Sequence, residues 1–442
     1  MADHIVIIGN GIAGITCARN IRKISKDSIT VISSETDHFY SRTALMYIYM
    51  GHMKYEHTKP YEDWFWEKNR ISLVRDLVIS ITASKKELLL QSGKAIYYDK
   101  LVIATGSVSN KPNFPGIELQ GVQSLYGIPD LELMVKNTRG ISQAVIVGGG
   151  LIGIEMAEML LSQNIQVTFL IRETAYWNNV LPAEEAEMVS RHIKDHHVNL
   201  RVSTGLREIL GDDDGRAKSI ITDKGEAIEA GFVGITVGVS PNIIIAKDAG
   251  VETDRGILVN EFFETNITDV YAIGDCVQHK SPPPGRKAVE QVWYTGKMHG
   301  ESLALTITGT KNKYNPGIWY NSAKFFDIEY QTYGTVNSIT SENEDSIYWE
   351  NTKDRIAFRA AFNANTNVIS GFNAMGMRLR HAVCDKWIRE ERSIDDVMAN
   401  LQLLNFDAEF STKYHDKILM SYNLKTGRNV VKQRKRKLFS FK

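Results

Sequence analysis

Two sets of glycines in the chain share the spacing Gly-x-Gly-x-x-Gly, and each set directly follows a run of β-forming residues. The first set is Gly9, Gly11 and Gly14, and the second is Gly148, Gly150 and Gly153. The first glycine of such a set permits a tight turn, the second lets a pyrophosphate approach the backbone, and the third allows a helix to pack closely on a strand. The helix that follows offers unpaired N–H groups and a positive dipole end to the phosphates. The sequence therefore predicts two nucleotide-binding lobes.

Three charged residues stand where they can contact a bound dinucleotide. Glu35 ends a second β-forming run, about 25 residues past the start of the first glycine set, where a carboxylate accepts hydrogen bonds from an adenosine ribose. Arg42 follows in a loop, and an arginine there can hold phosphate with two hydrogen bonds, although a solvated arginine would give the same pattern. Asp275 ends another run in Gly274-Asp275, where its carboxylate can bond ribityl or ribose hydroxyls.

The predicted elements place these residues at the ends of parallel strands. In the first lobe a helix over 15–24 follows the glycines, and a buried strand over 100–103 ends in the small-residue turn Ala104-Thr105-Gly106. In the second lobe a helix extends to about Gln163, and a strand over 166–171 follows it. A β-forming run before each glycine set and a helix after it is the strand–turn–helix context that dinucleotide binding requires.

Size and composition fit a globular protein of several domains. The chain has 442 residues, of which 43% are apolar and 24% charged, and its formal net charge is zero. These values predict two or three domains, and the zero net charge gives no reason to expect a nucleic-acid partner. No apolar run reaches the length of a membrane span. The first strand starts too early to leave room for a signal peptide, so a cytoplasmic location is predicted.

The cysteines and histidines give no sign of a metal or disulfide centre. Cys17, Cys276 and Cys384 are far apart in the sequence, which disfavours a disulfide framework and a C-x-x-C site. Cys17 falls on the first predicted helix and is expected in the core. His192 and His196 stand four positions apart on a charged helix, without a third ligand nearby in the sequence. We therefore expect these histidines on a solvated helix face, and no metal site is predicted.

The carboxyl-terminal part differs in character from the rest of the chain. Aromatic residues cluster from about Tyr314, and helices are predicted over 289–308, 376–392 and 394–404. The last 18 residues, 425–442, carry eight Lys or Arg and no acidic residue. A frayed, solvated tail is the preferred interpretation, and a patch that docks an acidic protein or a membrane surface is the alternative.

Together these residues resemble the two-dinucleotide-binding-domain flavoproteins, also called the pyridine nucleotide-disulfide oxidoreductase superfamily. The order and spacing of the glycine sets, the Ala104-Thr105-Gly106 turn and Tyr271-Ala-Ile-Gly-Asp275 match that superfamily over about residues 4–300. The resemblance implies an α/β fold with two Rossmann-like domains and a C-terminal α+β interface domain. The implied parts are an FAD-binding domain from 1–114 and 243–312, an NAD(P)-binding domain over 115–242, the interface domain over 313–424 and the basic tail 425–442.

The resemblance also implies roles for the residues of the site. Gly9, Gly11, Gly14, Glu35, Arg42 and the backbone near Val78 would bind the adenosine and pyrophosphate of FAD. Ala104, Thr105 and Gly106 would pack against the same cofactor, and Gly274 and Asp275 would reach its ribityl or pyrophosphate. Gly148, Gly150 and Gly153 would bind NAD(P)H, with Glu155 near the nicotinamide. No catalytic side chain is predicted, because the flavin carries the chemistry.

The lack of cysteine near the expected flavin site narrows the possible branch of the superfamily. Disulfide reductases and peroxidases of the superfamily carry flavin-facing cysteine, whereas Ser41 to Tyr47 contains none, so thiolate chemistry at the flavin is disfavoured. Without that cysteine, the chain resembles the ferredoxin, rubredoxin and nitrite reductases of the superfamily.

The residues after the strand of the second lobe leave the choice between NADH and NADPH open. At the end of this strand, Ile171 stands where an acid would favour NADH. Arg172 favours NADPH and Glu173 would repel its 2′-phosphate.

Three functions remain open at this stage. The favoured one is an FAD-dependent NAD(P)H oxidoreductase that passes electrons to a small iron–sulfur or rubredoxin-like carrier protein, with basic surface residues steering an acidic partner. The second is a peripheral NADH:quinone oxidoreductase anchored by the tail. The third is a flavin redox switch or binding protein of the apoptosis-inducing-factor type. The aromatic-rich third domain suggests a homodimer.

Overall fold

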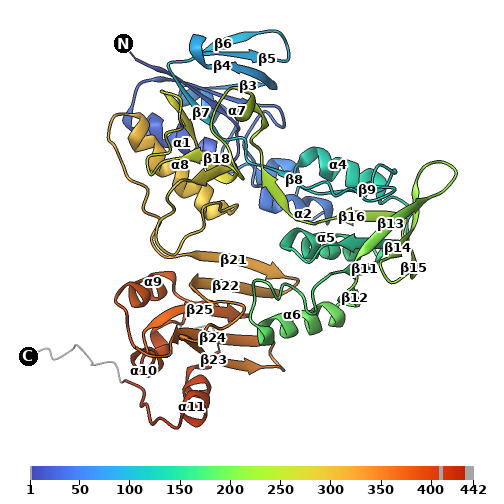
Figure 1. Cartoon of the computed structure of the whole chain (residues 1–442), viewed down its shortest axis with the longest axis vertical. Coiled ribbons are helices and arrows are strands. Elements are labelled where there is room, and N and C mark those ends of the chain that lie inside the picture. The colour runs from blue at the N-terminus through green and yellow to red at the C-terminus, as the bar shows by residue number, and fades with distance from the viewer. Residues whose placement is uncertain (1, 408–411, 434–442) are drawn as a thin grey trace, which may run out of the picture. The chain divides into compact units, whose positions relative to one another are not determined.

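The computed structural model describes residues 2–407 and 412–433, which pack into two compact units (Figure 1). The first unit comprises residues 1–172 and 198–316, and the second comprises residues 173–197 and 317–442. The finer domain boundaries expected from the sequence stay predictions.

A five-stranded parallel sheet forms the first lobe of the first unit. Its order is β19-β7-β1-β2-β3. The strands are β1 (His4–Ile8), β2 (Ser28–Ser33), β3 (Ile71–Arg75), β7 (Lys100–Ile103) and β19 (Val270–Ala272). Nearly continuous runs of Ile and Val, such as the fully buried Ile5 to Ile7, form these strands because both faces of a parallel sheet are covered. Helices α1 (Ile12–Ile24) and α8 (Trp293–Ile307) pack against each other beside this sheet (Figure 1).

A second five-stranded parallel sheet forms the other lobe of the same unit. Its order is β12-β11-β10-β16-β9. The strands are β9 (Val122–Gln123), β10 (Gln143–Val147), β11 (Gln166–Leu170), β12 (Asn199–Arg201) and β16 (Phe232–Ile235). Helix α5 (Leu151–Ser162) follows β10 directly, and α4 (Ile128–Asn137) precedes it in the chain. The two predicted lobes are thus confirmed as two parallel sheets.

Smaller elements connect and flank the two parallel sheets. Short sheets are formed by β4 (Val78–Thr82), β5 (Glu87–Leu90) and β6 (Ala95–Tyr97), by β13 (Leu206–Gly211), β14 (Ala217–Thr222) and β15 (Ala227–Glu229), by β8 (Ser107–Ser109) with β17 (Val239–Pro241), and by β18 (Ile257–Val259) with β20 (Val277–His279). The short helices are α2 (Leu45–Tyr49), α3 (Trp64–Lys68) and α7 (Ile244–Asp248), with single 3₁₀ turns η1 (Arg42–Ala44), η2 (Tyr55–Thr58), η3 (Ala83–Lys85) and η4 (Gly274–Cys276).

The second unit is α+β, as expected for the carboxyl-terminal part. Its antiparallel sheet has the order β21-β22-β25-β24-β23. The strands are β21 (Tyr320–Phe325), β22 (Ile328–Gly334), β23 (Glu344–Asn351), β24 (Ile356–Asn363) and β25 (Ile369–Met375). The helices are α6 (Ala183–Asp195), α9 (His381–Arg389), α10 (Ile394–Ala399) and α11 (His415–Thr426), with the 3₁₀ turn η5 (Leu401–Leu403).

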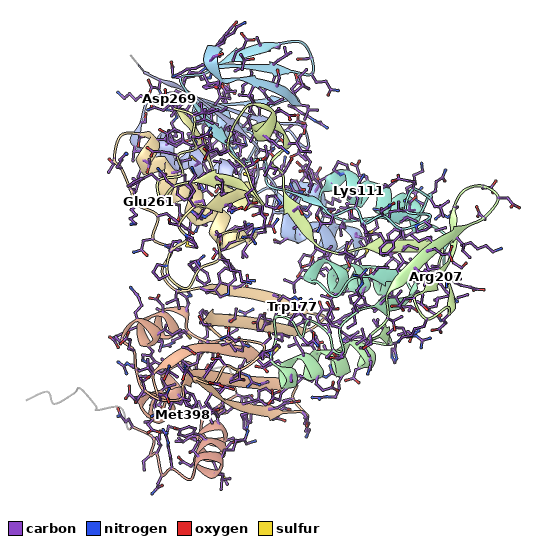
Figure 2. The ribbon with its side chains drawn as sticks, viewed as in Figure 1. Lys111, Trp177, Arg207, Glu261, Asp269 and Met398 are labelled. Carbon is purple, nitrogen blue, oxygen red and sulfur yellow. The ribbon has the colours of Figure 1, made fainter. Side chains whose placement is uncertain are left out.

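Aromatic contacts and a buried ion pair join residues 173–197 to the antiparallel sheet of the second unit. The Trp177 ring, labelled in Figure 2, meets the Phe325 and Tyr330 rings edge-on at 5.6 and 5.9 Å between centroids. The guanidinium of Arg359 donates two hydrogen bonds of 2.7 Å to the Glu185 carboxylate. Glu185 is 1% exposed and Arg359 5% exposed, so the buried Glu185 charge depends on Arg359 for neutralisation, while Arg359 also pairs with Glu184 at 2.6 Å.

Three predicted helices have different bounds in the structure. Helix α8 begins at Trp293 instead of residue 289, and Val292 directly before it has an extended backbone. Helix α9 covers only His381–Arg389 of the predicted 376–392, because β25 continues to Met375 and pairs there with Tyr330 of β22. The predicted helix over 394–404 is α10 followed by η5, and α11 was not predicted.

The described part of the tail from residue 425 is mostly exposed, as expected, but it is not frayed, because its cations have partners in the structure. Lys425 lies in the last turn of α11 and donates a hydrogen bond to the Tyr348 carbonyl at 2.6 Å. Arg428 lies 2.8 Å from the Asp395 carboxylate, and Lys432 lies 2.8 Å from that of Asp416. Arg428 and Lys432 are therefore paired with acids of their own unit. Residues 434–442 lie outside the described residues.

Within the described residues, no helix is long and apolar enough to cross a membrane.

Replacing Arg359 by Met should destabilise the second unit strongly. The substitution leaves the Glu185 carboxylate buried without a counter-charge, which costs about 3–5 kcal/mol. The double variant Arg359→Met/Glu185→Leu should recover most of the loss, because it removes both charges. Urea denaturation followed by tryptophan fluorescence measures the effect, and Arg378→Met, which breaks the exposed pair with Glu329, is the matched control at about 0–1 kcal/mol. Equal losses in the single and double variants would contradict this account.

Candidate functional site

The first glycine turn is held against the end of the neighbouring strand β7. Gly9 has a φ of 117°, and a Cβ atom there would lie 2.1 Å from the carbonyl oxygen of Ala104. The Ala104 N–H donates to the Ile8 carbonyl at 2.8 Å, which fixes that approach. A Cβ atom on Gly14 would lie 2.1 Å from the Gly9 carbonyl oxygen. Both positions therefore require glycine so that α1 can start directly above the sheet.

Gly11 differs from its neighbours because its α-carbon faces open space. It caps the N-terminus of α1 without a side-chain hydrogen bond, and the first helical turn holds no acidic residue. A Cβ atom there would meet no described atom within 4 Å. The amide of Asn10 donates to the Thr36 carbonyl at 2.9 Å and so ties the turn to the end of β2. An open, uncapped helix start of this kind fits a pyrophosphate.

The second glycine turn repeats this arrangement in the second lobe. Gly148 has a φ of 113°, and a Cβ atom there would lie 2.5 Å from the carbonyl oxygen of Thr236, the residue that follows β16. The Thr236 hydroxyl donates to the Gly148 carbonyl at 2.9 Å. Gly150 caps α5, and Gly153 would place a Cβ atom 2.7 Å from the Gly148 carbonyl oxygen. Sequence reasoning did not identify Thr236, which carries no motif of its own.

Glu35 and Arg42 are brought together as an ion pair. Arg42 Nη2 lies 2.6 Å from Glu35 Oε2, while the Tyr40 hydroxyl and the Ile128 N–H donate to Oε1 at 2.5 and 3.0 Å. Burial opposes ionisation of Glu35, but the hydrogen bonds from Arg42 and Tyr40 outweigh it and hold its pKa below the usual range. The carboxylate therefore also binds the start of α4. Its predicted contact with a ribose stays a prediction.

Gly274 and Asp275 lie where the end of β19 meets the turn after β7. Ser107 donates to the Asp275 carboxylate at 3.4 Å and accepts a hydrogen bond from the Gln291 amide at 2.7 Å. Burial raises the pKa of Asp275 to about 6. Neither Ser107 nor Gln291 was predicted, although Ser107 directly follows the small-residue turn. This polar chain sets the direction in which Asp275 can accept hydroxyl hydrogen bonds.

The small-residue turn joins β7 to the segment that returns from the second lobe. Thr105 donates through its hydroxyl to the Asn242 carbonyl at 2.6 Å, and the Asn242 N–H donates to the Gly106 carbonyl at 2.9 Å. Val78 is buried and begins β4 opposite Leu90. The roles of this turn and of the Val78 backbone toward a cofactor stay predictions.

In the second lobe, three residues are predicted to contact or select the nicotinamide nucleotide: Glu155, Ile171 and Arg172. Glu155 is half-buried on α5, and Arg172 is exposed just after β11. Ile171 is 1% exposed and its backbone pairs with Arg201 and Thr204. That it stands in the place of a ribose-binding acid stays a prediction. The contributions of Glu155 and Arg172 stay predictions.

The three cysteines are buried and unpaired with one another. Cys17 is fully buried on α1, which confirms its place in the core. Cys276 adjoins Asp275, but burial raises the pKa of its thiol to about 11. At neutral pH the thiol is therefore protonated and is a poor nucleophile.

The expectation of a solvated helix face is wrong for His192. Its side chain is 1% exposed, and its Nε2 lies 2.5 Å from the Asp327 carboxylate. His196 lies 3.2 Å from the same carboxylate oxygen. Asp327 is 131 residues beyond His196, so no local pattern could have shown that the fold brings them together.

Two buried histidines, His299 and His279, lie next to Gly274. The Gly274 N–H donates to Nδ1 of His299 at 3.1 Å, and Nε2 of His299 lies 3.4 Å from Nε2 of His279. The rings of Phe263 and Tyr314 enclose the pair. Burial lowers the pKa of His279 to about 4 and that of His299 well below its usual value. Both imidazoles are therefore neutral at physiological pH.

Comparison with known proteins gives the family. The family model described as pyridine nucleotide-disulphide oxidoreductase matches residues 3–299, and the chain belongs to this family. The chain is 27% identical over 85% of its length to nitrite reductase [NAD(P)H] of Bacillus subtilis (strain 168), of which it spans 46%. It is 28% identical over 70% of its length to the ferredoxin--NAD(+) reductase subunit of the benzene 1,2-dioxygenase system of Pseudomonas putida, of which it spans 75%.

One solved structure shares the fold over nearly the whole of this chain. An NAD-dependent persulfide reductase from A. fulgidus superposes with a TM-score of 0.84, at 24% identity, over 96% of this chain and 84% of that chain. The predicted fold, with two Rossmann-like domains and an α+β carboxyl-terminal domain, is thereby confirmed. The chain spans about half the length of the Bacillus relative.

Stability should fall between pH 6.5 and about 4 because the buried histidines must become charged. Below pH 6.5 the unfolded chain binds protons that folded His279 does not, so stability is lost as pH decreases through this window. For His279 alone the loss between pH 7.5 and 5 is about 2 kcal/mol, and His279→Gln should remove it. Urea denaturation at both pH values tests this, with the exposed His52→Gln as control. An unchanged pH dependence in His279→Gln would contradict the assignment.

Proposed function

We propose that this pyridine nucleotide-disulphide oxidoreductase binds FAD at the first glycine turn and NAD(P)H at the second. The observation that carries the proposal is the repeated helix start at Gly11 and Gly150, each a glycine cap without a side-chain hydrogen bond at the carboxyl end of a parallel sheet. Ligands of open parallel sheets bind at that end. Asp275, which can serve a second group of the same ligand, lies only at the first turn. The first lobe therefore suits the larger, tightly held cofactor.

Residues of the first lobe would hold and orient FAD. The N–H groups at the start of α1 face the pyrophosphate, and Gly11 leaves the space that it needs. Asp275 accepts hydrogen bonds from ribityl hydroxyls in a direction set by Ser107. Arg42 and Glu35 close the lobe beside the adenosine, where Arg42 also donates to the Tyr126 carbonyl at 2.7 Å.

Residues of the second lobe would hold the nicotinamide nucleotide. The start of α5 binds its pyrophosphate at Gly150, and Glu155, one helical turn further, positions the nicotinamide. Arg172 favours a 2′-phosphate, whereas Glu173, the next residue in the sequence, would repel one. Both NADH and NADPH are therefore to be tested as donors.

FAD, when bound, accepts a hydride from NAD(P)H and can release the two electrons singly. The protein's part is to position and shield the two rings, without a nucleophile of its own. Residues 41–47, where relatives with disulfide chemistry carry cysteine, contain none. The protonated thiol of Cys276 is also unsuited to that chemistry.

A small iron–sulfur or rubredoxin-like carrier protein is the proposed acceptor. The resemblance to the Pseudomonas putida ferredoxin--NAD(+) reductase subunit, of which the chain spans 75%, supports it. Arg428 and Lys432 of the tail pair with Asp395 and Asp416, which gives no support to a membrane-anchored quinone reductase. A cytoplasmic location and a homodimer stay predictions from the sequence.

Alanine at Gly11 and at Gly150 should separate the two nucleotide sites. Neither α-carbon has a left-handed φ or a close neighbour, so both variants should fold. Gly11→Ala should lose bound flavin, because its methyl group occupies the space of the pyrophosphate. Gly150→Ala should keep its flavin but raise the KM for NAD(P)H about tenfold, or 1.4 kcal/mol of binding.

The assay is NAD(P)H-dependent reduction of a [2Fe–2S] ferredoxin and of a rubredoxin, with flavin content read from the visible spectrum. Carrier reduction faster than oxygen or quinone reduction supports the proposed acceptor. Loss of flavin in Gly150→Ala with retention in Gly11→Ala would reverse the assignment of the lobes. Equal behaviour of both variants and wild type would refute both sites.

A further inference from the structure

Three potential metal ligands meet in the second unit, away from both glycine turns in sequence. His192 lies on α6, His196 caps the carboxyl end of the same helix one turn later, and Asp327 lies in the turn between β21 and β22. The Nε2 atoms of His192 and His196 lie 2.5 and 3.2 Å from the same oxygen, Oδ1 of Asp327. One donor atom from each of the three residues falls within 4.8 Å of the others.

Hydrogen bonding among these residues does not satisfy the buried imidazole. His192 is 1% exposed, yet neither of its ring nitrogens has a hydrogen bond of acceptable geometry in the described part of the chain. Leaving a buried polar group in this state costs about 1–3 kcal/mol. Imidazole nitrogens bind metal ions in the neutral form of the ring. A cation between the rings and the carboxylate would satisfy all three groups.

We propose that His192, His196 and Asp327 bind a divalent transition-metal ion, Zn²⁺ by preference. Two imidazole nitrogens and a carboxylate oxygen are ligands that zinc favours, at bond lengths of about 2.0–2.2 Å. Tetrahedral bonds of that length place donor atoms about 3.3 Å apart. The His196–Asp327 distance of 3.2 Å already matches, and the His192–Asp327 distance of 2.5 Å needs a shift of under about 1 Å. The Asp327 side chain is 62% exposed, so water can fill the fourth position.

Neighbouring groups hold the ligands in place. The His196 ring stacks on that of Phe326, with centroids 4.2 Å apart and planes at 7°. Arg355 lies 3.5 Å from Oδ2 of Asp327 and 3.8 Å from the carboxylate of Asp195. Arg355 thus binds the second carboxylate oxygen and leaves Oδ1 for the ion, while its charge lowers the affinity. The ion would tie α6 to the β21–β22 turn and so act as a structural link within the unit.

Zinc titration of the purified, metal-stripped flavoprotein by isothermal calorimetry tests the site. Wild type should bind one Zn²⁺ per chain and should melt at a higher temperature with zinc, since a ligand of the folded state stabilises it. His196→Gln and Asp327→Asn should weaken the affinity at least about tenfold and abolish the zinc-dependent rise in Tm. Both side chains are partly exposed, so these variants should fold, which an unchanged circular dichroism spectrum and an unchanged Tm without zinc verify.

The matched control is His197→Asn, which removes an exposed histidine next to the cluster. His197 has a φ of 63°, a conformation that asparagine tolerates, and its variant should bind zinc as wild type does. Absence of saturable zinc binding by wild type would overturn the proposal. Unchanged affinity in His196→Gln and Asp327→Asn, or an equal loss in His197→Asn, would overturn it as well.

Discussion

The fold depends on the close approach of a glycine turn to the end of the next parallel strand. At Gly9 the backbone of Ala104 occupies the space of a side chain, and at Gly148 the backbone of Thr236 does the same. This contact lets each helix begin directly above its sheet, so that its unpaired N–H groups point out of the carboxyl end. Gly11 and Gly150 cap the two helices without a side-chain hydrogen bond. One steric constraint, used twice, thus produces both candidate nucleotide sites.

Polar side chains that are far apart in sequence complete each unit. In the first unit Gln291 and Ser107 orient Asp275, while His299 supports Gly274 from the opposite side. In the second unit Arg359 and Glu185 neutralise each other inside the core. Each group is buried with its partner because an unpaired buried charge or donor is costly. These networks therefore fix positions more than they add stability.

Local patterns in the sequence were sufficient for the two parallel sheets and both glycine turns. A Val- and Ile-rich run that is followed by glycines at fixed spacing and by a helix can be recognised from about 30 consecutive residues of sequence. Partners such as Tyr40 with Glu35, Thr236 with Gly148 and Asp327 with His192 depend on tertiary packing, which no local period encodes. The solvated face expected for His192 failed for this reason, since charged neighbours on α6 hid a buried position. Likewise, the run of cations after α11 looked free because its acidic partners lie elsewhere in the chain.

Anaerobic titration of the purified protein with NADH and with NADPH, followed by visible spectroscopy, tests the central claim most directly. The account predicts an oxidised flavin spectrum before titration and its bleaching by about one equivalent of a reduced nicotinamide nucleotide, because FAD accepts the hydride. A protein without a flavin spectrum, or a flavin that neither nucleotide bleaches, would contradict it.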